Sequence, residues 1–522
     1  MNSITTFETI IGSDLPLNLT NQKSEESLND SDRWYYIDKD MISAKLTYFF
    51  RGLERSSIAP YLTMFFISIG LNLKQVGYVF SFSYAGLMLG SVFWGVVADK
   101  TRAYRVLLLI LCIFSALTTL SIPLVSAQIG EKEKNQCPLL LNKCCFNSTV
   151  NISKNRTSKD NTSVSSTTMS IVMANLGFLA FSFSGTISSY IDGGVIWKIK
   201  MSTKKRDFGR QYMFLNIGFA CGALISAEVM NIFPKVDLSC YFAVFCVNVV
   251  IIIASCISSQ YLYKNTKLPS QKEVRSDSFQ KDLFKTLSTF EVDLFLATTF
   301  VNGLLYSIYL GYFFLFMKEI KSTNLLVGLT VAFGSTSGMI VNFFNELVIK
   351  LFRGTFNTMI ICTFLWSVRY FIFYFLKNPW LIIPLQLTLH GLSVSLFLSV
   401  KSVYLKKKAP NSIHNTMFGI VQCLYSGVSM IVGSLIGGQL YFAYGARLTF
   451  LYSCFFALGW TSFLCVYIIA IKLWKINVGK KPNSTCMLNT TINIGAQEDL
   501  TVLSKSTAEM HLNRKFIPPS LS

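Results

Sequence analysis

Charge and histidine are scarce in this chain. Asp, Glu, Lys and Arg make up only 14% of its 522 residues, and there are three histidines. The sequence contains no phosphate-binding GxxxxGK[ST] loop, no HExxH helix and no CxxC pair, so metal-dependent and phosphoryl-transfer chemistry lack the side chains that they need. Thr336 also replaces the serine that a GxSxG nucleophile elbow requires. We therefore predict that the protein is not an enzyme and uses no metal and no cofactor.

Apolar residues, in contrast, fill long continuous stretches and make up 52% of the chain. A helix needs about 20 mainly apolar residues to cross the roughly 30 Å hydrocarbon core of a bilayer. The sequence provides such stretches at 43–70, 74–97, 106–127, 168–198, 209–231, 240–263, 290–317, 323–347, 356–376, 380–404, 415–437 and 447–474. These stretches predict an all-α membrane protein with twelve transmembrane helices in two six-helix halves.

The polar segments define the expected domain organisation. Residues 1–42 form a polar N-terminal tail without a signal peptide, 43–263 the first half, 264–289 a charged linker, 290–474 the second half, and 475–522 a C-terminal tail. The net charge of +20 comes largely from basic residues in the short loops on one side. Such an asymmetry marks the cytosolic side and is not a nucleic-acid footprint. We expect both termini to be cytosolic, in a plasma or endolysosomal membrane.

The longest predicted loop, 127–167, lies on the opposite, extracellular side. It carries four N-x-Ser/Thr sequons, at Asn147, Asn151, Asn155 and Asn161. Glycans are added only on the lumenal side, so these sequons fit the predicted position, although a Ser- and Asn-rich segment also produces sequons by chance. The same loop contains three cysteines, Cys137, Cys144 and Cys145, which allow a disulfide from Cys137 to either of the others.

Ionisable residues at membrane depth are costly and point to a transport pathway. Spacings of three and four residues place Arg51 beside Glu54 and Arg55 on one face of the first helix. Glu54 can neutralise one arginine and leave one positive charge for an anionic solute. Alternatively, both arginines reach back to the headgroups.

Further ionisable residues lie in later helices. Asp192 in the fourth helix is the expected partner of a cation in the first half. Arg369 and His390 are the pathway candidates of the second half, where a histidine either transfers protons or packs through a hydrogen bond. Lys401 and Glu228 lie near helix ends, and we expect both side chains to extend to the headgroups.

Glycines recur in the second, fifth, eighth and eleventh helices. Small residues four apart let helices approach closely. This pattern indicates either tight static packing or a sliding interface between the two halves, and its recurrence at the same positions of both halves favours the second. The residues concerned are Gly86, Gly90, Gly95, Gly218, Gly222, Gly328, Gly334, Gly338, Gly427, Gly433, Gly437 and Gly438.

The second helix closes with a run of an acid followed by basic residues. This candidate gating loop consists of Gly95, Asp99, Lys100, Arg102 and Arg105. An aspartate at such a helix end pairs with basic groups or with a neighbouring helix N-terminus, and these contacts break when two halves separate.

This run resembles the loop-two motif of the major facilitator superfamily, Gly-x-x-x-Asp-Arg/Lys-x-Gly-Arg-Arg/Lys. It departs from the motif at Ala103 and Tyr104, where the motif has basic residues. Six further segments are informative: 92–99, 208–214, 312–318, 378–381, 389–391 and 433–441. Through these segments the chain resembles, within the superfamily, the group of major facilitator superfamily domain-containing protein 6 from 43 to 474, except in the long loop.

The resemblance implies that the protein is a transporter. The chain departs from the pattern of this group at two positions. Gln386 stands where the group leads us to expect an acid, and Leu398 stands where we expect tryptophan. We predict a secondary-active or facilitative transporter that moves a small organic solute, in one reading an anionic one, by alternating access. The alternative is a non-transporting surface receptor or scaffold that presents its glycosylated outer loop to a protein partner.

Overall fold

The protein is described by a computed structural model that places residues 41–101, 103–136, 161–200, 208–233, 239–264, 279–408 and 414–479. Helices account for almost all of these residues, and no strand occurs among them. The predicted all-α fold is therefore confirmed. Cys137, Cys144, Cys145, Asn147, Asn151 and Asn155 lie outside the described residues.

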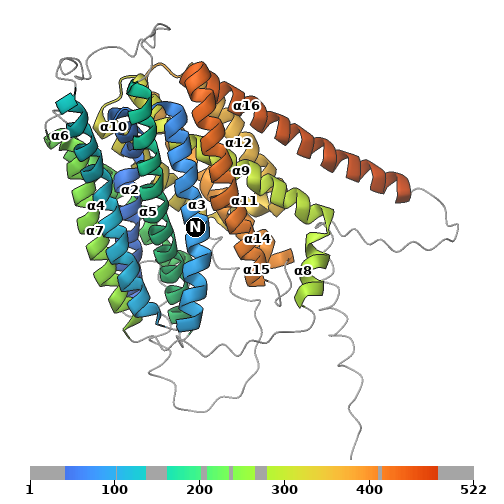
Figure 1. Ribbon diagram of the computed structural model, residues 1–522. Coiled ribbons are helices and arrows are strands. Elements are labelled where there is room, and N and C mark those ends of the chain that lie inside the picture. Colours follow the sequence, from blue (N-terminus) through green and yellow to red (C-terminus); the bar gives the residue numbers. More distant parts are fainter. Residues whose placement is uncertain are drawn as a thin grey trace, which may run out of the picture.

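The first half consists of six long helices. They are α2 (Ile42–Ser68), α3 (Leu73–Thr101), α4 (Tyr104–Gln136), α5 (Asn161–Lys200), α6 (Phe208–Ile232) and α7 (Ser239–Tyr263). Within this half α3 packs against α5, α2 against α6, and α4 against α7 (Figure 1). Helices α4 and α5 both extend into the predicted outer loop. Helix α4 ends at Gln136, and α5 begins at Asn161, the last of the four predicted sequons.

The second half has the same number of membrane-length helical segments, but its helices are interrupted more often. Its elements are α9 (Phe290–Glu319), α10 (Asn324–Phe343), α11 (Asn345–Leu351), α12 (Thr355–Phe375), η2 (Pro379–Leu381), α13 (Ile382–Leu385), η3 (Gln386–Ser395), α14 (Leu396–Lys408), α15 (His414–Cys423), η4 (Leu424–Val428) and α16 (Ser429–Gly479). A short helix that the sequence did not predict, α8 (Phe279–Leu287), precedes α9 within the linker.

These helices give twelve membrane crossings. By length and composition, ten described segments can span a membrane. The longest, Met417–Ile471, is broken at Gly445, whose φ of 79° and ψ of 174° are non-helical, so it crosses twice. Helix α2 adds the remaining crossing, because it has the length of a span but carries the charges of Arg51, Glu54 and Arg55.

Close helix approach inside each half depends on glycine. A Cβ on Gly86 would collide with the backbone at Phe178 of α5, and one on Gly218 would collide with the carbonyl of Phe49 on α2. Most of the glycines that the sequence singled out therefore pack within a half. Those that contact the opposite half are Gly328, Gly427 and Gly438. The glycine pattern thus indicates mainly tight packing within each half, and only a minority of these glycines lie at the interface between the halves.

The two halves are joined at one end of the bundle, where α2 ends and α3 begins; we call this the tied end. Helix α6 packs on α10, α3 on α16, and α2 on α9. The Thr63 hydroxyl donates to the Gly311 carbonyl at 2.6 Å, and Asn324 Nδ2 donates to Asn231 Oδ1 at 3.0 Å. Gln439 donates to the Tyr78 hydroxyl at 3.1 Å. These contacts fix the halves together at this end.

Candidate substrate-binding site

The charged residues of α2 form a cluster with α5. Arg51 is only 1% exposed and pairs with Glu54, one helical turn away. Its guanidinium also donates to the Ser188 hydroxyl at 2.8 Å and to the hydroxyl and carbonyl of Ser184. Arg51 does not extend to the headgroups, because its charge is neutralised and hydrogen-bonded inside the first half.

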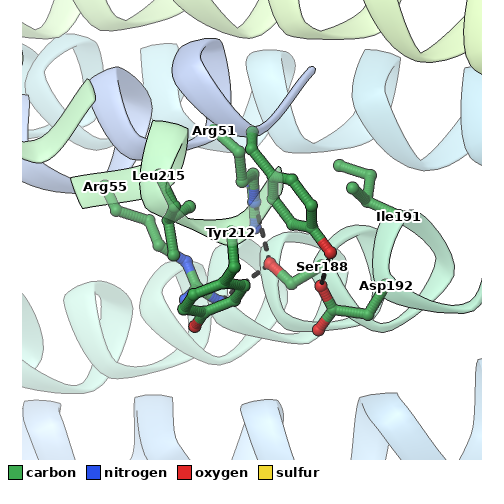
Figure 2. A pocket seen from close by; sticks show the side chains of 8 residues that line it. Arg51, Arg55, Ser188, Ile191, Asp192, Tyr212 and Leu215 are labelled. Carbon is green, nitrogen blue, oxygen red and sulfur yellow. Dashed lines mark hydrogen bonds between the residues drawn. The ribbon is translucent and has the colours of Figure 1, made fainter. Parts of the chain in front are cut away.

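Arg55 lies one turn further along α2 and has an exposed side chain. Its guanidinium donates to the same Ser188 hydroxyl at 2.8 Å. Figure 2 shows both arginines directed toward Ser188, with Tyr212 of α6 beside Arg55. The pocket between these side chains has a cavity volume of about 20 Å³, enough for a single water molecule.

Asp192 lines the same pocket but has a different partner from the one expected. Its Oδ1 accepts a hydrogen bond from the Tyr48 hydroxyl at 2.8 Å, and no arginine lies within ion-pair distance of it in the described part of the chain. The spacing of Ser184, Ser188 and Asp192 places all three on one face of α5. With Glu54 and Asp192 present, the two arginines of α2 leave this cluster with no surplus charge.

A second cluster surrounds Arg369 of α12, which is 0% exposed. Its Nη2 donates to Gln386 Oε1 at 2.7 Å and lies 3.2 Å from His390 Nδ1, while Nη1 is 3.4 Å from the Ser393 hydroxyl. Gln386 in turn donates to the Tyr309 hydroxyl at 3.1 Å. The residues Gln386, His390 and Ser393 all come from the π-helical segment η3, a kind of segment that often marks functional sites.

Aromatic rings enclose this guanidinium. Its central carbon lies 4.0 Å from the ring centre of Tyr309, 5.1 Å from Trp366 and 5.6 Å from Phe373. The ring faces attract the cation but do not neutralise it. Trp366 and Tyr309 are themselves buried. Arg369 therefore lies in a cage that holds it rigidly.

No carboxylate in the described part of the chain pairs with Arg369. Among the described residues none forms an ion pair with it, and its buried Nε has no hydrogen-bond acceptor. Taking an ion out of water costs several kcal/mol unless an opposite charge compensates it. A buried charge without an ion-pair partner thus lies at Arg369, whereas the sequence led us to expect the surplus charge in the first helix.

His390 is half-buried and contacts Arg369 directly. Because a guanidinium can only donate, His390 Nδ1 must be the acceptor in this contact. The imidazole ring packs on α10 where Gly334 leaves room, since a Cβ there would lie 3.3 Å from the ring. The histidine is therefore held by both α10 and Arg369.

Tyr306 of α9 packs against core clusters that contain residues of both halves. Its ring stacks on Tyr425, with centroids 6.2 Å apart, and lies 6.4 Å from Tyr309. Tyr306 is therefore the aromatic residue that connects the Arg369 cluster with Tyr425 and with the core of the first half.

The candidate gating loop is described in part. Gly95 and Lys100 belong to α3, and Lys100 is exposed. Arg105 Nε donates to Gln260 Oε1 of α7 at 3.0 Å. The side chain of Asp99 and the whole of Arg102 lie outside the described residues, so the gating role stays a prediction.

Sequence reasoning did not identify several residues of these clusters. Ser184 and Ser188 had a detectable signal, because with Asp192 they form a polar face spaced by four in an otherwise apolar helix. Trp366 also had one, because it lies three residues before Arg369 on the same helix, α12. Ser393 had none, since only the packing of α12 against η3 brings it to Arg369.

Fold and site together define a class: a multi-pass, all-helical membrane protein with two six-helix halves and a buried arginine in each half. Solved transporters share this fold. The nucleoside transporter NupG is 14% identical, over 82% of this chain and 99% of that chain, with a TM-score of 0.60. A POT family transporter in complex with 5-aminolevulinic acid is 12% identical, over 83% of this chain and 97% of that chain, with a TM-score of 0.57. At these identities the similarity shows the fold alone.

The family follows from the sequence match. The MFS_1 like family matches residues 41–452. The chain belongs to this family, and the resemblance to the major facilitator superfamily is confirmed. The narrower resemblance to the group of domain-containing protein 6 stays a prediction.

Proposed function

We propose that the protein is a secondary transporter that moves a small organic anion by alternating access between its two halves. One observation carries the proposal: Arg369 is fully buried and has no carboxylate partner among the described residues. A carboxylate or phosphate group of a substrate would supply the missing charge and accept from the free Nε. A neutral solute would leave the cost of the buried cation uncompensated.

The arrangement of the halves supports alternating access. With both termini in the cytosol, as the basic loops predict, the tied end is the outer end. Hydrogen bonds such as Thr63 to Gly311 then hold the outer end closed, which fits a state that opens toward the cytosol. The proposal includes membership of the group of domain-containing protein 6 and a location in the plasma or endolysosomal membrane.

The test is untargeted metabolite accumulation in cells that express the wild type or Arg369→Gln at equal surface levels. We expect a solute with an acidic group to accumulate with the wild type and to fall at least about tenfold with the variant, the equivalent of 1.4 kcal/mol. Arg447→Gln is the matched control, because this exposed arginine only hydrogen-bonds the carbonyls of Tyr374 and Leu376.

Equal accumulation of every solute by wild type and Arg369→Gln would reject the proposal. The receptor alternative depends on the outer loop, most of which lies outside the described residues. No contact in the described bundle favours that alternative.

A further inference from the structure

A second buried cation lies nearer the other end of the bundle. Lys401 of α14 is 2% exposed, although its position near a helix end led us to expect a side chain that reaches the headgroups. That expectation is wrong. The Lys401 ammonium donates to Gln422 Oε1 at 3.0 Å and lies 4.5 Å above the ring centre of Tyr425, both of which draw it inward.

Lys401 also lacks a carboxylate partner within the described residues. Glu291, which contacts two other residues of α14, binds the Tyr404 hydroxyl at 3.1 Å and the Lys408 ammonium at 3.2 Å. An ammonium has three donors, and only one of those on Lys401 has a hydrogen-bond partner here. The remaining two are free to bind an anion.

Lys401 is accessible through its neighbour. Gln422 is exposed, and its amide donates to the Ser426 hydroxyl at 2.8 Å, so a polar surface leads to the buried ammonium.

A chain of tyrosines connects this cluster with Arg369. Tyr425 lies under Lys401 and stacks on Tyr306, which lies beside Tyr309, and Tyr309 stacks on Arg369. Lys401 follows the Arg369 contact Ser393 by eight residues, which is roughly 12 Å along a helix axis. The two cations are thus too far apart to bind one carboxylate, but they are joined by flat aromatic surfaces.

We propose that Lys401, Gln422 and Tyr425 form a second binding station for an aromatic or otherwise planar organic anion, between the Arg369 site and the end of α14. This inference rests on the proposed function and adds a site and a substrate class to it. The ammonium binds the acidic group, and the Tyr425 ring packs on the planar part. Two weak stations in series let a solute enter and leave without being trapped.

The experiment measures equilibrium binding of benzoate to the full chain in lipid nanodiscs, with benzamide as the uncharged probe. We expect two benzoate sites in the wild type, one in Lys401→Gln, and two in Lys401→Arg, which keeps the charge. Benzamide should bind to neither station. Lys350→Gln is the control, because Lys350 is exposed on α11 and should leave two sites.

The outcomes separate the two proposals. A single wild-type site that Arg369→Gln abolishes and Lys401→Gln leaves intact supports the proposed function and overturns the second station. Loss of a site in Lys401→Gln with no loss in Arg369→Gln supports the station and counts against the Arg369 site. No benzoate binding to the wild type overturns the station.

Discussion

At the scale of single residues, the amide of Gln386 is the polar group that lies against the Arg369 guanidinium. Gln386 occupies the position where the family resemblance leads us to expect an acid, and it lies 2.7 Å from Arg369. A carboxylate there would pair with the guanidinium and neutralise it. The amide instead binds and orients Arg369 without removing its charge, which leaves the cation for a substrate.

Gln386→Glu should therefore weaken anion binding. The new carboxylate would compete with the acidic group of the ligand for Arg369, so we expect benzoate affinity at this site to fall by about tenfold or more. The measurement is the same nanodisc titration. Gln439→Glu changes a half-buried amide that contacts Tyr78 and should leave binding unchanged. Unchanged affinity in Gln386→Glu would show that Arg369 does not bind the anion.

At the scale of elements, the site depends on how α10 supports the π-helical segment. The Ser337 hydroxyl accepts from the Gly391 amide at 2.9 Å, and Gly334 gives space to the His390 ring. These contacts fix the side of η3 that faces Arg369. The twelve apolar stretches predicted where helices would form. They did not predict that η3 is π-helical, because the π-helical geometry depends on packing with α10 and α12.

Gly334→Val should damage the site through this packing. The added side chain would press on His390, so we expect a loss of stability of about 1–3 kcal/mol and weaker benzoate binding at Arg369. Thermal unfolding in detergent and the nanodisc titration measure the two effects. Gly459→Val is the control, since nothing lies within 4 Å of its Cβ position; equal effects in both variants would exclude a specific role of the α10 contact.

At the scale of the whole molecule, the two halves must separate at the tied end for alternating access. Asn324 and Asn231 hydrogen-bond across that end, at the start of α10 and the end of α6. Thr63 and Gln439 make further contacts there. The state described here is therefore one of at least two that transport by rocking halves requires.

Joining Asn231→Cys to Asn324→Cys with a short bis-methanethiosulfonate reagent should stop accumulation of the transported solute. The cross-link would hold the tied end closed, and reduction with dithiothreitol should restore transport. Each single variant, treated in the same way, controls for the native cysteines. Full transport by the cross-linked double variant would show that this end does not open.

The amino-acid sequence was enough to predict the twelve helices and the membrane as solvent, because apolar length and loop charge are local properties of the chain. It also placed Arg51, Glu54, Arg55, Asp192, Arg369 and His390 at membrane depth. The fold was needed to show which of these charges have a partner. Glu54 pairs with Arg51 and Asp192 lines the same pocket as Arg55, whereas Arg369 and Lys401 have no ion-pair partner within the described residues, because ion pairing depends on distances between helices that are far apart in the sequence.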